Sequence, residues 1–181
     1  MGFGLRPRIL IHILVISLTA SSIVNVAQSQ STAASTADEY LTPHNDARAG
    51  LNQGIPSLTW DTTLESYATD WAATRAAAGD DCALIHSGGP YGENIYWSSG
   101  PSTPADAVQA WVSEEAYYDY ATNSCSAPEG ESCKFFSCFS CLVVWRDTAA
   151  LGCGSATCPS GALFVVCSYD PPGNFVGQLP Y

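Results

Sequence analysis

The cysteines of this 181-residue chain constrain its fold more than any other feature. All eight lie between Cys82 and Cys167, and three of them fall within the stretch ESCKFFSCFSCLVVWR, residues 131–146. In a chain that folds in an oxidising compartment, this spacing indicates disulfides. The cysteine positions alone leave many pairings open.

The N-terminus predicts that oxidising compartment. Arg6 and Arg8 precede an apolar run over residues 9–18, and Ala27-Gln28-Ser29 offers a small-x-small cleavage site. This pattern is typical of a secretory signal peptide over residues 1–29. The apolar run is well short of the ~20 residues that a spanning helix needs, so we expect a secreted protein without a membrane span.

The charge balance excludes one class of partner. Loss of residues 1–29 would remove both leader arginines and leave four cationic side chains against 17 carboxylates. Such a surface repels phosphate backbones, so we expect no nucleic-acid partner.

Hydrophobic periodicity and turn residues predict a layered domain. Helices are expected over residues 38–50, from a Thr62–Glu65 capping box to Gly79, and from Thr103-Pro104 onward. Strands are expected over residues 82–87, 94–97 and 142–145, and in a hairpin of residues 151–158 and 162–169. Helices on both sides of a small sheet give an α/β/α arrangement.

A histidine and two glutamates could form a partial metal site. His44 lies on the inner face of the first helix, Glu93 sits in the turn GEN, and the third helix carries Glu114 and Glu115 close to Trp111. Imidazole and carboxylate groups are ligands of zinc. The favoured alternative is that His44 is a core histidine bonded to a carboxylate. No GxSxG motif or phosphate-binding loop is present.

Three tyrosines follow the third helix. Tyr117, Tyr118 and Tyr120 could line an apolar ligand groove with their hydroxyl groups in water, or they could simply pack at the rim of the core.

Several segments together resemble one family. They are PHNDARAG, LTWDTTLESYATDWA, CALIHSGGPYGENIYW, VVWRDTAALGC and CSYDPPGNFVGQLPY. They resemble the plant pathogenesis-related proteins of family one, in the superfamily of cysteine-rich secretory proteins and antigen 5. The resemblance covers residues 38–181 and implies an α+β fold, a disulfide-stapled three-layer α-β-α sandwich. Residues 30–37 are expected to be a flexible lead-in.

The resemblance also implies a cleft with two histidines and two glutamates. His44, Glu93 and Glu114 match three of these, and Phe139 stands where the second histidine is expected. A zinc ion would therefore have fewer ligands than in the family. Residues 134–142 either diverged from the family pattern or reflect an error in the gene structure.

The family disulfides carry over as Cys82–Cys153, Cys125–Cys133 and Cys158–Cys167. Cys138 and Cys141 are left over. A bridge between them is possible, but alternating strand faces would put the two on opposite sides, which argues against it. A lone CxxC is weak evidence for zinc, and Lys134 is the only nearby group that could activate a thiolate.

The C-terminal segment resembles the family's peptide-release region. Cleavage by a protease between Asp170 and Pro171 would free residues 171–181. The resemblance as a whole implies a defence protein that is secreted to the apoplast and binds a sterol or related lipid. We expect it to be a monomer. No cofactor is expected to be required. The alternative is a metal-dependent hydrolase that uses the His44, Glu93 and Glu114 cleft.

Overall fold

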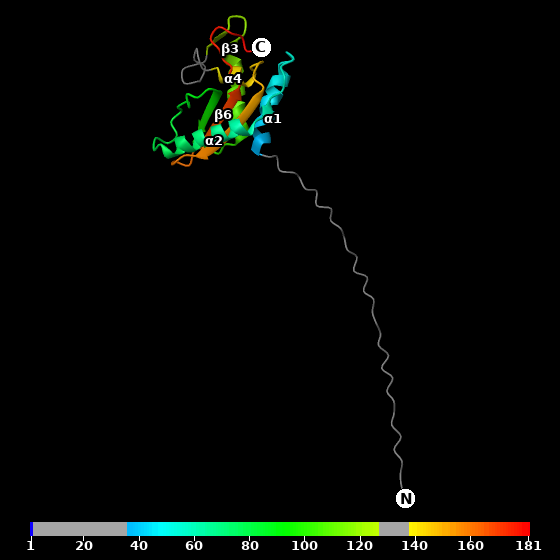
Figure 1. Cartoon of the computed structure of the whole chain (residues 1–181), viewed down its shortest axis with the longest axis vertical. Coiled ribbons are helices and arrows are strands. Elements are labelled where there is room, and N and C mark those ends of the chain that lie inside the picture. Colours follow the sequence, from blue (N-terminus) through cyan, green and yellow to red (C-terminus); the bar gives the residue numbers. More distant parts are fainter. Residues whose placement is uncertain (2–35, 127–137) are drawn as a thin grey trace. The chain divides into compact units, whose positions relative to one another are not determined.

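The structure is a computed structural model that describes Met1, residues 36–126 and residues 138–181. The leader, most of the expected lead-in and Cys133 lie outside the described residues. The elements run in the order α1 (Thr36–Gly50), β1 (Thr59–Trp60), α2 (Thr62–Ala77), β2 (Gly92–Ser98), α3 (Pro104–Ser113), the 3-10 helix η1 (Glu114–Tyr117), β3 (Tyr118–Asp119), β4 (Ser124–Cys125), α4 (Phe139–Val143), β5 (Ala150–Thr157) and β6 (Leu163–Asp170) (Figure 1).

A four-stranded sheet in the order β1-β5-β6-β2 forms the middle layer. β5 and β6 make the expected antiparallel hairpin, β2 pairs antiparallel with the other edge of β6, and the short β1 pairs parallel with β5. The three-layer α-β-α arrangement is confirmed, because α2 covers one face of this sheet and α1, α3 and α4 cover the other.

Alternation along β5 and β6 assigns each residue to one face. Gly152 and Gly154 face α2 so closely that a Cβ at Gly152 would lie 2.1 Å from the Glu65 backbone nitrogen. A Cβ at Gly154 would lie 2.4 Å from the hydroxyl of Thr69. The GCG pattern of β5 thus lets α2 lie directly on the sheet, while the neighbouring Leu151 points into the α1–α3 core.

The capping residues of α3 are those predicted from the sequence, and the cap of α2 differs by one residue. Thr103 caps α3 in a reciprocal capping box with Asp106, and Pro104 takes the first turn as expected. The N-cap of α2 is Asp61, whose carboxylate accepts hydrogen bonds from the backbone amides of Thr63 and Leu64. The predicted cap, Thr62, is therefore one residue too late. Glu65 instead accepts a hydrogen bond from the Trp60 indole at 2.8 Å.

Two of the expected disulfides are wrong, because each would join cysteines on opposite faces of the sheet. The structure pairs Cys82 with Cys158 and Cys153 with Cys167, in place of Cys82–Cys153 and Cys158–Cys167. Cys153 and Cys167 are direct partners in the β5–β6 register and share the α1–α3 core. Cys82 and Cys158 lie in the cluster under α2, so the expected pairs would have joined opposite faces of the sheet. Cys125 is disulfide-bonded, and its expected partner lies outside the described residues.

The strand predicted over residues 142–145 is wrong. Residues 139–143 form the short helix α4, and a disulfide joins Cys138 and Cys141 at its start. Because one helical turn brings residues three apart to the same side, the alternation that argued against this bridge does not apply.

A buried arginine holds α4 and the loops around it. Arg48 of α1 is 1% exposed, and its guanidinium makes four hydrogen bonds to backbone carbonyls. These belong to Pro56 at 2.6 Å, Val143 at 3.1 Å, Trp145 at 2.9 Å and Thr148 at 3.0 Å. One side chain therefore joins α1, the end of α4 and the loop that leads into β5.

Candidate functional site

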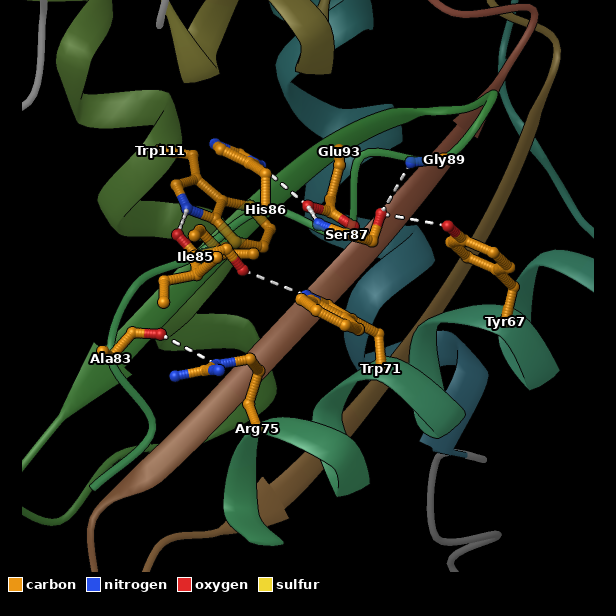
Figure 2. A network of polar contacts seen from close by, with 11 residues as sticks. Tyr67, Trp71, Arg75, Ala83, Ile85, His86, Ser87, Gly89, Glu93 and Trp111 are labelled. Atoms are coloured by element: carbon orange, nitrogen blue, oxygen red, sulfur yellow. Dashed lines mark hydrogen bonds and ion pairs between the residues drawn. The ribbon is translucent and has the colours of Figure 1, made fainter. Parts of the chain in front are cut away.

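Residues 82–89 follow α2 as an irregular segment, so the strand predicted at 82–87 is wrong. Three α2 side chains hold it. Tyr67 donates to the Ser87 hydroxyl, Trp71 to the Ile85 carbonyl, and Arg75 to the Ala83 carbonyl, as Figure 2 shows.

The spacing of these bonds is regular. Successive donors are four residues apart on α2, which is about 6 Å of helix rise. The acceptors belong to alternate residues of the segment, and a tight turn, in which the Ile85 amide donates to the Ala83 carbonyl at 2.8 Å, lies between the first two. One face of α2 thus holds alternate residues of the segment. The residue between two anchored positions, His86, is left free to face Glu93.

His86 and Glu93 are hydrogen-bonded across the glycine- and proline-containing turn that joins residue 87 to β2. The His86 Nδ1 lies 2.7 Å from Glu93 Oε1, which also accepts the Ser87 backbone amide at 2.9 Å. Burial raises the pKa of Glu93, but the hydrogen bonds from His86 and Ser87 outweigh it and hold that pKa below its usual value. Oε2 of Glu93 is buried and has no partner among the described residues.

A cavity of about 190 Å³ adjoins this pair. We call it the Glu93 cavity; it is lined by His86, Gly92, Glu93, Phe139, Leu142, Gly173 and Asn174. Phe139 links it to the other expected glutamate, since its backbone amide donates to Glu114 at 3.1 Å and its ring centre lies 6.4 Å from that of His86. The position where a histidine was expected is thus at the cavity, occupied by phenylalanine.

His44 is not part of this cavity. It is fully buried on α1, where Nδ1 donates to the Tyr40 carbonyl at 2.7 Å and Nε2 accepts from the Tyr169 hydroxyl at 2.8 Å. Asn94 donates to the same hydroxyl at 3.0 Å. The structure therefore agrees with a core histidine, with a carbonyl and a tyrosine as partners where a carboxylate was expected.

The expected metal set is not assembled by this geometry. Both ring nitrogens of His44 are used within the core, and Glu93 and Glu114 lie around a different residue, Phe139. Within residues 36–126 and 138–181, no three His, Cys, Asp or Glu side chains converge where a metal ion could bind. A zinc site at His44, Glu93 and Glu114 does not fit, and we derive no metal-dependent step.

Sequence reasoning missed His86 because it treated residues 82–87 as a strand. A usable signal was present: the turn SGGPYG places residues on its two sides next to each other, as in a hairpin. The histidine of the Glu93 cavity is therefore His86, and His44 is structural.

A larger groove lies along another side of α4, where Cys138 and Cys141 line it. It has a volume of about 410 Å³, and we call it the tail groove. It is lined by Tyr118, Thr122, Asn123, Ser124, Cys125, Cys138, Cys141, Trp145, Asn174, Phe175, Val176, Gly177 and Gln178. Of the three tyrosines expected to contact lipid, only Tyr118 is among these lining residues. Tyr120 stacks on Tyr181 with ring centres 4.8 Å apart.

Comparisons with known proteins agree with this architecture. The family model described as the cysteine-rich secretory protein family, CAP, matches residues 41–169. The chain belongs to this family. It is 45% identical over 146 residues to pathogenesis-related protein PRMS of Zea mays, covering 79% of this chain and 81% of that protein. It is 40% identical over 182 residues to pathogenesis-related protein 1B of Nicotiana tabacum, covering the whole of both.

Solved structures support the CAP fold. The structure of BmVAL-1 matches with a TM-score of 0.63 at 21% identity, covering 85% of each chain. Together with the plant relatives, this makes the chain a CAP protein of the plant pathogenesis-related type. None of the helices in its described residues has the length and apolar character of a membrane span.

The buried state of His44 predicts a pH dependence of stability. Burial lowers the pKa of His44 from 6.5 to about 4. The unfolded chain takes up this proton below pH 6.5 while the folded chain does not, so the free energy of unfolding should fall as the pH drops from 6.5 towards 4. The loss is about 3 kcal/mol at most.

Urea unfolding at pH 7.0, 6.0 and 5.0 measures this slope. Replacing His44 by Gln should flatten it, because the side chain that burial keeps neutral in the folded chain is then gone. The depressed pKa of Glu93 affects stability only below about pH 4.5, outside this window. An unchanged slope in His44→Gln would show that His44 is not the buried neutral group.

Proposed function

We propose that this CAP protein is a secreted plant defence protein that binds a sterol or similar amphipathic lipid in the tail groove. Its leader supports export, and its buried disulfides, such as Cys153–Cys167, suit an oxidising compartment such as the apoplast. The observation that carries lipid binding is the tail groove itself, whose volume falls within the range of small-molecule sites.

The lining of the tail groove suits an amphipathic ligand. Tyr118 and Phe175 offer aromatic surface for an apolar ring system, and the Phe175 ring meets the buried Trp145 ring edge-on with centres 5.9 Å apart. Asn123 and Gln178 add polar groups to the lining. Apolar walls with a few polar groups are the usual composition of lipid and cofactor sites.

The rim of the groove extends this apolar surface. Val176 is 73% exposed, and Phe175 and Leu179 are also exposed. Adjacent exposed apolar side chains of this kind mark binding surfaces more often than isolated ones do. The negative charge of the chain, −11 over the full sequence, disfavours anionic lipid and leaves a neutral lipid such as a sterol as the better ligand.

Sterol titration of the purified protein should give saturable binding that depends on the rim. We expect Val176→Asp to raise the dissociation constant about tenfold, because it replaces apolar contact with a charge. Leu84→Asp is the matched control, since Leu84 is an exposed apolar residue that does not line the tail groove. Both sites are exposed, so stability should change little. Sterol binding that does not saturate, or that both variants weaken equally, would exclude the tail groove as the binding site.

The second part of the proposal is release of residues 171–181, the C-terminal tail. The tail is anchored at several points: Thr148 donates to the Pro171 carbonyl at 2.9 Å, Asn123 to that of Gln178 at 3.0 Å, and the Arg146 amide to that of Pro180 at 2.8 Å. Figure 1 shows the C-terminal end of the chain beside β3. The Asp170 carbonyl also accepts from the Ala149 amide at 3.0 Å, so a protease needs local opening of this end of the sheet.

Tail release predicts a specific peptide and a loss of lipid binding. Mass spectrometry of extracellular fluid after pathogen challenge should detect the peptide of residues 171–181, and Asp170→Ala should abolish it. The truncated protein should bind sterol at least about tenfold more weakly, because residues 174–178 form one wall of the tail groove. Absence of the peptide from challenged wild-type tissue would refute release without bearing on lipid binding.

A further inference from the structure

The Cys138–Cys141 disulfide has no role in the fold comparable with that of the other bridges. Its cysteines are three residues apart, against 14 for Cys153–Cys167 and 76 for Cys82–Cys158. A bridge that closes a small ring restricts the unfolded chain least, so among the three bridges with both cysteines in the described residues it is the easiest to open.

Of these three bridges it is also the most accessible. Cys138 and Cys141 both line the tail groove and are 7% and 5% exposed. The other two bridges lie inside the core clusters, and none of their four cysteines is more than 3% exposed. Reaction of a thiol with a disulfide requires access to a sulfur atom, and the tail groove provides it here.

The two sulfur atoms are not equivalent. Cys138 Sγ accepts a hydrogen bond from the Cys141 backbone amide at 3.2 Å, and the Ser140 hydroxyl lies 3.2 Å from the same sulfur. Hydrogen bonds to the charged form stabilise a thiolate, so Cys138 is the better leaving group. An incoming thiolate therefore attacks Cys141.

Opening the bridge leaves the supports of α4 in place. Glu114 still accepts from the Phe139 amide, and Arg48 still donates to the Val143 carbonyl, because neither contact involves sulfur. The segment can be reduced and reoxidised without loss of the packing that positions it.

We propose that Cys138–Cys141 is a thiol–disulfide exchange site for a small thiol that enters the tail groove. The thiolate sulfur of the small molecule bonds to Cys141 Sγ, the Cys138–Cys141 bond breaks, and its electron pair stays on Cys138 as a thiolate. A second equivalent of thiol then attacks the sulfur of the bound small molecule. This step forms the disulfide of the small thiol and leaves Cys141 as a thiolate, so the bridge gains two electrons and two thiols are oxidised. The reaction needs no lipid and is independent of the proposed lipid binding.

Graded reduction of the wild-type protein tests access and ring size. The protein is exposed to increasing reduced glutathione, quenched in acid, alkylated, digested and mapped by mass spectrometry. Cys138 and Cys141 should be released at a thiol concentration about tenfold or more below that needed for Cys82–Cys158 and Cys153–Cys167. Release of all three bridges together, or of Cys138–Cys141 last, would overturn the proposal.

A matched pair of single-cysteine variants tests the assignment of roles. In Cys141→Ser the remaining Cys138 keeps its backbone hydrogen bond, whereas in Cys138→Ser the remaining Cys141 has no such donor among the described residues. At pH 7, iodoacetamide should modify Cys138 at least about threefold faster than Cys141. Equal rates, or a faster Cys141, would overturn the assignment of Cys138 as leaving group. If either variant fails to fold, the wild-type reduction series still decides whether the exchange site exists.

Discussion

The buried guanidinium of Arg48 is the interaction on which the functional end of the molecule depends. Within the described residues no carboxylate pairs with it; four backbone carbonyls surround it instead. Burial lowers its pKa to about 10, so it stays charged at neutral pH. A buried charge is tolerated only when its donors are satisfied, and the planar fork of arginine satisfies several carbonyls at once.

The groups that Arg48 holds are those that build the tail groove. It fixes the carbonyl of Trp145, whose ring packs so closely on the tail that a Cβ at Gly173 would lie 2.4 Å from it. It also fixes the carbonyl of Thr148, whose hydroxyl holds Pro171. Arg146, between these two residues, binds the tail again through its amide. A helix near the N-terminus thus sets the position of the last residues of the chain.

Local patterns were sufficient to predict much of the fold. Periodicity and capping residues located α1, α2 and α3 to within a few residues, and the glycine turn located the β5–β6 hairpin. The error at α4 has a physical reason: LVVW reads as a buried strand, but a run of four apolar residues does not distinguish a strand from one buried helical turn. The structure places Val143 at the end of that turn, fully buried.

The site was harder to predict, because it depends on register and on distant segments. His44 has helical spacing that suits an inner face, yet periodicity does not say whether an inner face meets a cavity or the core. The pairing of Cys82 with Cys158 required knowing which face of the sheet each cysteine occupies. The tail groove joins Tyr118 to residues 174–178, and no local pattern connects two segments so far apart in sequence.

The measurement that tests this account most directly compares Arg48→Lys with Arg146→Lys. Lysine keeps the charge but cannot reach all four carbonyls, so Arg48→Lys should lower the free energy of unfolding by about 2–4 kcal/mol and abolish saturable sterol binding. Among the described residues the Arg146 side chain makes one hydrogen bond, to the exposed Gln53 carbonyl, so Arg146→Lys should lose less than about 1 kcal/mol and still bind sterol. If Arg48→Lys had the same free energy of unfolding and the same sterol affinity as the wild type, the buried arginine would not be the support of the tail groove.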